Sequence, residues 1–173
     1  MGQRLWTAPP GSMDQGQLRG LGVAGGAQTE WWFYHLERGA LEVALGPLLE
    51  KCLEKGWRVL VVAAPDRLKD LDAALWTWRD DSFTPHGVDG PDASRQPILL
   101  SSAADPKNGA RAVVLLDGAD ADAGAFERCM VMFDGADTDV RSKARGQFKA
   151  AKDAGAPVRY FQQGDRGGWV EKT

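Results

Sequence analysis

At residues 56–65 the chain reads GWRVLVVAAP: a glycine, an apolar run broken only by one arginine, and a proline. A short, valine-rich run of this kind is typical of a strand that is buried on both faces, as in a parallel sheet covered by helices. Gly56 suits the end of the element before it, and Pro65 suits the first turn of a helix expected over 66–79. This stretch therefore predicts an α/β fold.

Helical and strand patterns alternate on both sides of this strand. An aromatic run at 31–36 predicts the first strand, and leucines at helical spacing predict a helix over 40–55. We expect this strand–helix–strand unit to form a parallel pair. Further strands are expected at 97–100, 112–116 and 129–133, a helix over 138–154, and closing strand material at 158–162 and 168–170. The sequence predicts a single α/β domain over 30–173, with a mostly parallel sheet flanked by helices.

Residues 1–29 differ from the rest in composition. They are rich in Gly, Gln and small residues without sustained periodicity, so we expect a disordered N-terminal extension, either a leader or a misplaced start. Residues 20–25, GLGVAG, match the pattern G-x-G-x-x-G. A dinucleotide-binding fingerprint follows a strand, whereas polar residues precede this one, so we expect no cofactor there.

The overall composition limits the classes of protein. The 173 residues contain no apolar run near the roughly 20 residues that span a bilayer, and no signal-peptide pattern, so we expect a cytoplasmic protein without membrane contact. The two cysteines are far apart, which argues against a disulfide framework or a zinc site. The net charge of −3 gives no general affinity for nucleic acid, but residues 141–173 hold eight Lys/Arg against three acidic residues. A local basic face is therefore expected.

A catalytic constellation is not evident. Residues 113–117, VVLLD, resemble the strand and acid that hold magnesium in P-loop nucleotidases, but the phosphate-binding G-x-x-x-x-G-K-[ST] is missing. His35 lies within an aromatic strand and is expected in the core, and neither Ser82 nor Ser101 sits in a nucleophile elbow. The sequence favours a binding protein over an enzyme and leaves a nucleotide-binding α/β enzyme as the weaker alternative.

The helix over 138–154 carries two stripes. Arg141, Arg145, Lys149 and Lys152 form a basic stripe, and an apolar stripe that includes Phe148 lies beside it. This arrangement could receive an acidic peptide with an aromatic anchor and a terminal carboxylate. The same pattern also fits a solvated basic face over an ordinary core helix.

The helix over 66–79 contains two tryptophans on different faces. At 100° per residue, Trp78 joins the apolar stripe and is expected in the core, whereas Trp76 falls off it. An off-stripe Trp followed by Phe83, Pro85 and His86 has the composition of an interface anchor. Periodicity alone equally allows the helix to fray early, with Trp76 folded under the loop.

Several stretches together resemble the chi subunit family of bacterial DNA polymerase III. They are FYHL at 33–36, LLEK at 48–51, GWRVL at 56–60, LDAALW at 71–76, SFTPHG at 82–87, FDG at 133–135 and ARGQFKA at 144–150. The likeness covers about residues 31 to 172, and the pairing of Leu-Trp with Ser-Phe-x-Pro-His is its most specific part. It implies a Rossmann-like three-layer domain and a non-catalytic accessory subunit of the DNA polymerase III holoenzyme, a DNA-directed DNA polymerase.

The resemblance also implies partners and contact residues. Family members join the clamp loader through the psi subunit and bind the acidic C-terminal tail of single-stranded DNA-binding protein, so contact with DNA is mainly indirect. Trp76, Phe83, Pro85 and His86 are expected on the psi-binding surface, which could instead serve a DNA-repair helicase. The tail-binding residues are expected to be Arg141, Arg145, Phe148, Phe133 and Lys149.

Overall fold

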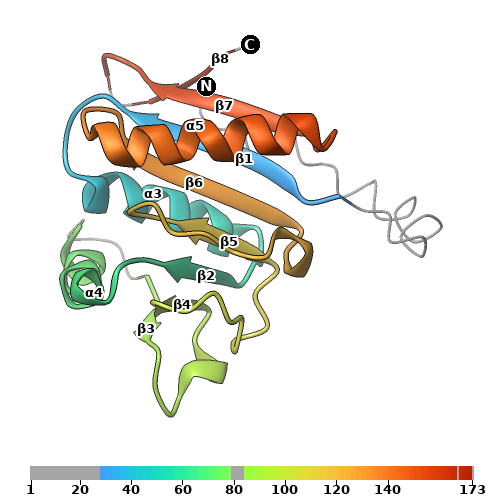
Figure 1. The fold of residues 1–173 in the computed structure, drawn as a ribbon. Coiled ribbons are helices and arrows are strands. Elements are labelled where there is room, and N and C mark those ends of the chain that lie inside the picture. The colour runs from blue at the N-terminus through green and yellow to red at the C-terminus, as the bar shows by residue number, and fades with distance from the viewer. Residues whose placement is uncertain (1–27, 79–83, 167, 173) are drawn as a thin grey trace.

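A computed structural model describes residues 28–78, 84–166 and 168–172 of the chain. They form one eight-stranded sheet in the order β3-β4-β2-β5-β6-β1-β7-β8 (Figure 1). Neighbouring strands are parallel, except that β8 runs antiparallel to β7. The predicted α/β domain with a mostly parallel sheet is confirmed. The expectation of a disordered extension over 1–29 falls almost wholly outside the described residues.

The strands and helices have the following bounds. The strands are β1 (Glu30–Leu36), β2 (Val59–Val62), β3 (Gly87–Val88), β4 (Ile98–Ser101), β5 (Ala112–Leu115), β6 (Arg128–Asp134), β7 (Val158–Gln163) and β8 (Trp169–Lys172). The helices are α3 (Leu41–Glu54), α4 (Leu68–Thr77) and α5 (Thr138–Asp153), with short 3-10 turns η1 (Pro65–Arg67), η2 (Ala93–Arg95) and η3 (Ala123–Ala125).

Two layers of helices cover the sheet. Helices α3 and α4 pack on one face through Leu45, Leu49, Leu71 and Leu75, and α5 packs on the other through Ala144 (Figure 1). Side chains alternate along each strand, so Trp32 and Tyr34 of β1 face α3 whereas Phe33 faces α5. Among the described helices, none is long and apolar enough to cross a membrane.

Three neighbouring strands, β4, β2 and β5, have the composition that a sheet covered on both faces requires. All four residues of β2, VLVV, are buried, as are those of β4 and β5. The expected pairing of β1 with β2 is wrong, however, because β5 and β6 lie between them. A strand–helix–strand unit fixes the parallel direction of its two strands, but later strands can still insert between them.

Helix α4 begins after the proline-led turn η1 and ends at Thr77, slightly inside the range expected from the sequence. Trp78 is partly buried and packs against the α3 core, where a side chain at Gly46 would collide with its ring. Its Nε1 atom donates to the Thr84 hydroxyl at 3.2 Å. Trp78 therefore lies on the core side, as predicted, and Trp76 lies 52% exposed on another face of the helix.

Candidate functional site

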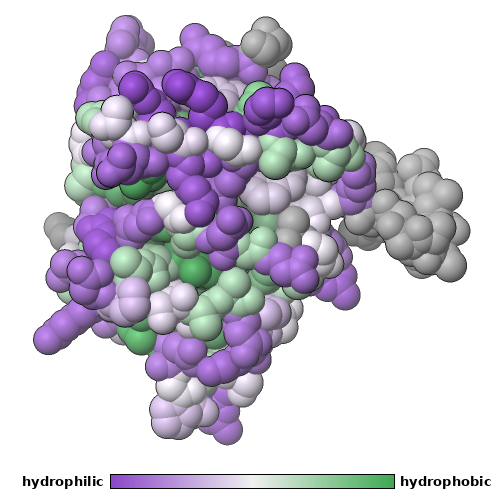
Figure 2. All heavy atoms as spheres, in the orientation of Figure 1, coloured by the Kyte–Doolittle hydropathy of each residue, from purple (hydrophilic) through white to green (hydrophobic). Residues whose placement is uncertain are grey.

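Helix α5 starts and stops through local sequence signals. The Asp137 carboxylate accepts hydrogen bonds from the backbone N–H groups of Asp139 and Val140, which caps the N-terminus as predicted. Gly155, with a φ of 78°, follows the C-terminus in the left-handed conformation that favours glycine. The outer side of the helix carries mainly hydrophilic residues (Figure 2). The inner side covers β6, β1 and β7.

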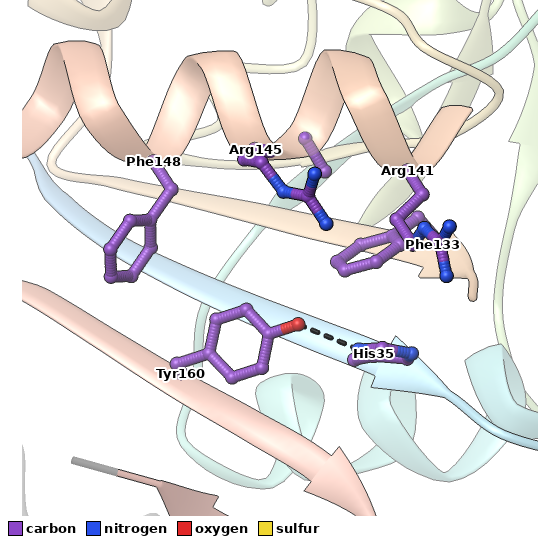
Figure 3. A pocket seen from close by; sticks show the side chains of 7 residues that line it. His35, Phe133, Arg141, Arg145, Phe148 and Tyr160 are labelled. Carbon is purple, nitrogen blue, oxygen red and sulfur yellow. Dashed lines mark hydrogen bonds between the residues drawn. The ribbon is translucent and has the colours of Figure 1, made fainter. Parts of the chain in front are cut away.

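A pocket of about 300 Å³ lies between α5 and the sheet. Figure 3 shows its labelled side chains arranged around one hollow, with the α5 residues above His35 and Tyr160. The lining consists of His35, Phe133, Arg141, Ala144, Arg145, Phe148 and Tyr160. Three of the four elements that supply these residues are adjacent strands, so the pocket depends on the order of the sheet.

Strand register brings the floor of the pocket together. His35 of β1 lies beside Phe133 of β6, and Phe33 of β1 lies beside Tyr160 of β7. The alternation of side chains places His35, Phe133 and Tyr160 on the face that α5 covers. The roof comes from α5, where Arg141, Arg145 and Phe148 follow at helical spacing.

Aromatic rings form one wall of the pocket. The centre of the Phe148 ring lies 5.4 Å from that of Phe33 and 5.7 Å from that of Tyr160, both edge to face. The His35 ring lies 5.0 Å from the Phe133 ring. These contacts hold the rings in place and leave an apolar surface beside the arginines.

The polar side of the floor is a short chain of hydrogen bonds. His35 Nδ1 lies 2.6 Å from the Tyr160 hydroxyl, and His35 Nε2 lies 3.4 Å from a Glu37 carboxylate oxygen. Gln162 in turn donates to Glu37. Burial raises the pKa of the Tyr160 hydroxyl, as does the charge of Glu37, while the nearby arginines act in the opposite direction. The hydroxyl therefore keeps its proton at neutral pH.

Two cations line the pocket from α5. Within the described part of the chain, neither Arg141 nor Arg145 forms an ion pair, and Arg145 is exposed. Lys149 instead pairs with Asp153 at 3.0 Å and does not line the pocket. The structure thus brings together four of the five residues expected at a tail-binding site and leaves Lys149 outside. Chemically, the pocket can hold a carboxylate next to an aromatic or aliphatic group.

His35 and Tyr160 are pocket residues that the sequence did not indicate. His35 was expected in the core, but its side chain is 17% exposed and lines the pocket. The alternation within β1 was a usable signal, because it places residue 35 on the same face as Phe33. For Tyr160 there was no such signal, since its place depends on β7 lying next to β1.

The expected partner surface on α4 is partly described. The Trp76 ring lies 4.8 Å from the ring of His86, centre to centre. The His86 side chain is buried, with Nδ1 at 2.5 Å from the Thr84 carbonyl oxygen and Nε2 at 3.0 Å from an Asp72 carboxylate oxygen. His86 thus lies beneath Trp76 and supports its ring, and the expected contact of His86 with a partner stays a prediction. Pro85 is half-buried, and Phe83 lies outside the described residues.

Asp117, the acid at the end of the apolar strand, is part of an ion-pair network. Its carboxylate accepts from Arg67 Nε at 3.2 Å, and Arg67 also pairs with Glu42 at 2.9 Å. A second pocket of about 230 Å³ adjoins Asp117 at the ends of β2 and β5. No group of three or more His, Cys, Asp or Glu residues in the described ranges is placed to hold a metal ion. The network explains Asp117 as a link between α3, η1 and the loop after β5.

Comparison with known families places the chain beside a replication protein family. The model of the family described as DNA polymerase III chi subunit, HolC, matches residues 29–159, about three quarters of the chain. The matched range includes Trp76 and every pocket residue except Tyr160, which lies one position beyond it. A search of curated proteins found no match.

Proposed function

The chain belongs to the family of DNA polymerase III chi subunits, which act in DNA replication, and on that basis we propose that it bridges two partners of the replication machinery. One is the acidic C-terminal tail of single-stranded DNA-binding protein, which would bind in the pocket under α5. The other is a psi subunit of the clamp loader, which would bind around Trp76. The protein itself is a non-catalytic accessory subunit in this proposal.

The observation that carries the tail-binding role is that two arginines lie beside aromatic rings in the same pocket. Arg141 and Arg145 offer guanidinium groups without intramolecular acidic partners among the described residues, and Phe148 and Phe133 offer apolar surface within the same pocket. A peptide that ends in an aromatic residue and carries acidic groups presents both complements at once. Each guanidinium–carboxylate hydrogen bond would add about 1.5–3 kcal/mol to binding.

The size of the pocket supports a chain end as the ligand. Its volume of about 300 Å³ lies at the small end of the range for ligand pockets. One aromatic side chain and a carboxylate would fit a space of this size. The exposed position of Arg145 leaves it able to meet further acidic residues of a peptide that runs along α5.

The proposal for the second partner depends on Trp76. A tryptophan that is half exposed and backed by a buried, hydrogen-bonded histidine is a preorganised anchor of the kind that dominates protein interfaces. The sequence resemblance favours a psi subunit there, and a DNA-repair helicase is the alternative occupant of the same surface. DNA would be reached mainly through the partners.

Calorimetric titration tests the tail-binding role directly. The probe is a synthetic acidic peptide that ends in phenylalanine with a free carboxylate, and the control is the same peptide with a C-terminal amide. We expect the free acid to bind and the amide to bind much more weakly. If the two peptides bind equally, or neither binds, the pocket is not a receptor for this tail.

A further inference from the structure

The hydrogen bond between His35 and Tyr160 has two possible directions, and the direction decides what the hydroxyl can do for a ligand. Nε2 of His35 faces Glu37, which only accepts, so in the neutral ring Nε2 carries the proton. Nδ1 is then a bare acceptor, and the Tyr160 hydroxyl, 2.6 Å away, donates to it. In this state the hydroxyl proton is engaged inside the protein.

Protonation of His35 reverses that hydrogen bond. The imidazolium donates from both nitrogens, to Glu37 through Nε2 and to the Tyr160 oxygen through Nδ1. The hydroxyl proton is then released and can rotate about the C–O bond toward the pocket. A carboxylate bound there would accept it as a further hydrogen bond beyond those from the arginines.

We propose that His35 and Tyr160 form a proton-linked receptor for the carboxylate of the bound peptide, in which the peptide and a proton on His35 favour each other's binding. This rests on the proposed tail-binding function and adds two residues that determine affinity and its pH dependence. The pocket thus gains a third positive group when the peptide is bound.

The charges that surround His35 agree with this role. On β1 itself the Glu37 carboxylate faces Nε2 of His35, and from β7 come the neutral Tyr160 hydroxyl and Gln162, which donates to Glu37. From α5, Arg141 and Arg145 add two positive charges to the same pocket, and a bound carboxylate would offset them. At the end of β6 the exposed Asp134 carboxylate accepts a backbone hydrogen bond from Ala136.

The backbone at Gly135 and the ring of Phe133 pack against the imidazole of His35. A Cβ atom at residue 135 would collide with the ring of His35, so glycine there leaves the space that the ring occupies. Phe133 packs against one side of the same ring. A ring held on these sides keeps Nδ1 in line with the Tyr160 hydroxyl, as a relay of this kind requires.

The test uses the full chain and the acidic peptide that ends in phenylalanine, titrated at several values between about pH 6 and pH 8, where the peptide's own carboxylates stay ionised. For the unaltered protein we expect affinity to rise about fivefold toward the lower pH, the range of one hydrogen bond. Calorimetry in two buffers of different ionisation enthalpy should show proton uptake on binding.

Tyr160→Phe, which removes only the hydroxyl, should bind weakly at every pH. His35→Leu should bind with no pH dependence and no proton uptake.

The outcomes separate this inference from the function on which it rests. If the unaltered protein binds the peptide with the same affinity across the pH range, or without proton uptake, the His35–Tyr160 relay is wrong while tail binding stands. If Tyr160→Phe keeps the full pH dependence, His35 acts as a simple charge and the relay is again wrong. If the peptide does not bind at all, the proposed tail-binding function fails, and the relay fails with it.

Discussion

The guanidinium carbon of Arg128 lies 4.2 Å from the centre of the Trp32 ring, and the Trp57 ring lies 4.7 Å away from the same carbon. Arg128 also pairs with Glu30 at 2.9 Å. Its Nε and Nη1 atoms are buried without a hydrogen-bond partner among the residues that the structure describes, and the two rings provide their electrostatic surroundings instead. This cluster closes the edge of the core where β6 and β1 begin.

Replacing Arg128 with alanine should therefore destabilise the fold. We expect the free energy of unfolding to fall by about 3 kcal/mol, because Glu30 loses its cationic partner, keeping only the hydrogen bond from Trp32 Nε1, and both tryptophans lose their cation. Urea denaturation measures this. Arg111→Ala is the matched control, since the Arg111–Glu127 pair is exposed on both sides and should contribute less than about 0.5 kcal/mol. Equal losses in the two variants would show that the rings add nothing.

Within the pocket, Arg145→Ala should weaken binding of the acidic peptide about tenfold or more, because a charge-assisted hydrogen bond is lost. Lys149→Ala on the same helix is the control and should change affinity less than twofold, since Lys149 pairs with Asp153 outside the pocket. Calorimetric titration at low and high salt gives both values, with weaker binding at high salt. A larger effect from Lys149 than from Arg145 would contradict the assignment of the site.

On the other surface, Trp76→Ala should abolish capture of a psi-type subunit while the fold remains intact, because half of the Trp76 side chain is exposed and the residue lies outside the core. Pull-down followed by circular dichroism checks both points. Val170→Ala, which alters an exposed apolar residue on β8, should leave capture unchanged. Retention of the partner by the Trp76 variant would place the anchor elsewhere.

Stability should also fall in acid through the pair formed by Arg159 and Glu171. Hydrogen bonds from Arg159 lower the pKa of Glu171 below its ordinary value of 4.5. A lowered pKa in the folded state stabilises the fold above 4.5, and this contribution disappears as the pH falls through the folded-state pKa.

Glu171→Gln should accordingly be less stable than the unaltered protein at neutral pH, with the difference shrinking in acid. Thermal unfolding across the acidic pH range measures this. Asp165→Asn serves as the control because Asp165 is fully exposed and its contact with Arg38 is long. A difference that stays constant with pH would show that the pair does not titrate in this way.

Local patterns foretold the parts of this molecule that short stretches of chain determine. The 100° step placed Trp76 outside the apolar stripe, and the Asp137 cap and Gly155 marked the ends of α5. These features depend on neighbours within a few residues, so sequence is sufficient for them. The burial of His86 was not foreseen, because it depends on Asp72 from the preceding helix.

The order of the strands was beyond such reasoning. Periodicity shows that a segment is a strand but not which strand lies beside it, so β1 was expected next to β2 and lies between β6 and β7. For the same reason the place of Tyr160 in the pocket could not be predicted, since Tyr160 contacts His35 from 125 positions away in the sequence. The α5 half of the pocket was therefore predictable, whereas most of its floor was not.

The interior position of β1, between β6 and β7, has a consequence for synthesis on the ribosome. This strand is among the first described segments to emerge, yet it pairs only with residues 128–134 and 158–162, near the other end of the chain. Both edges of β1 can be paired only after most of the protein has been synthesised, and until then its aromatic side chains stay uncovered. Closing such long loops is slow, and the exposed strand is open to aggregation in the meantime. A nascent chain that stalls before α5 would therefore be a natural client for chaperones.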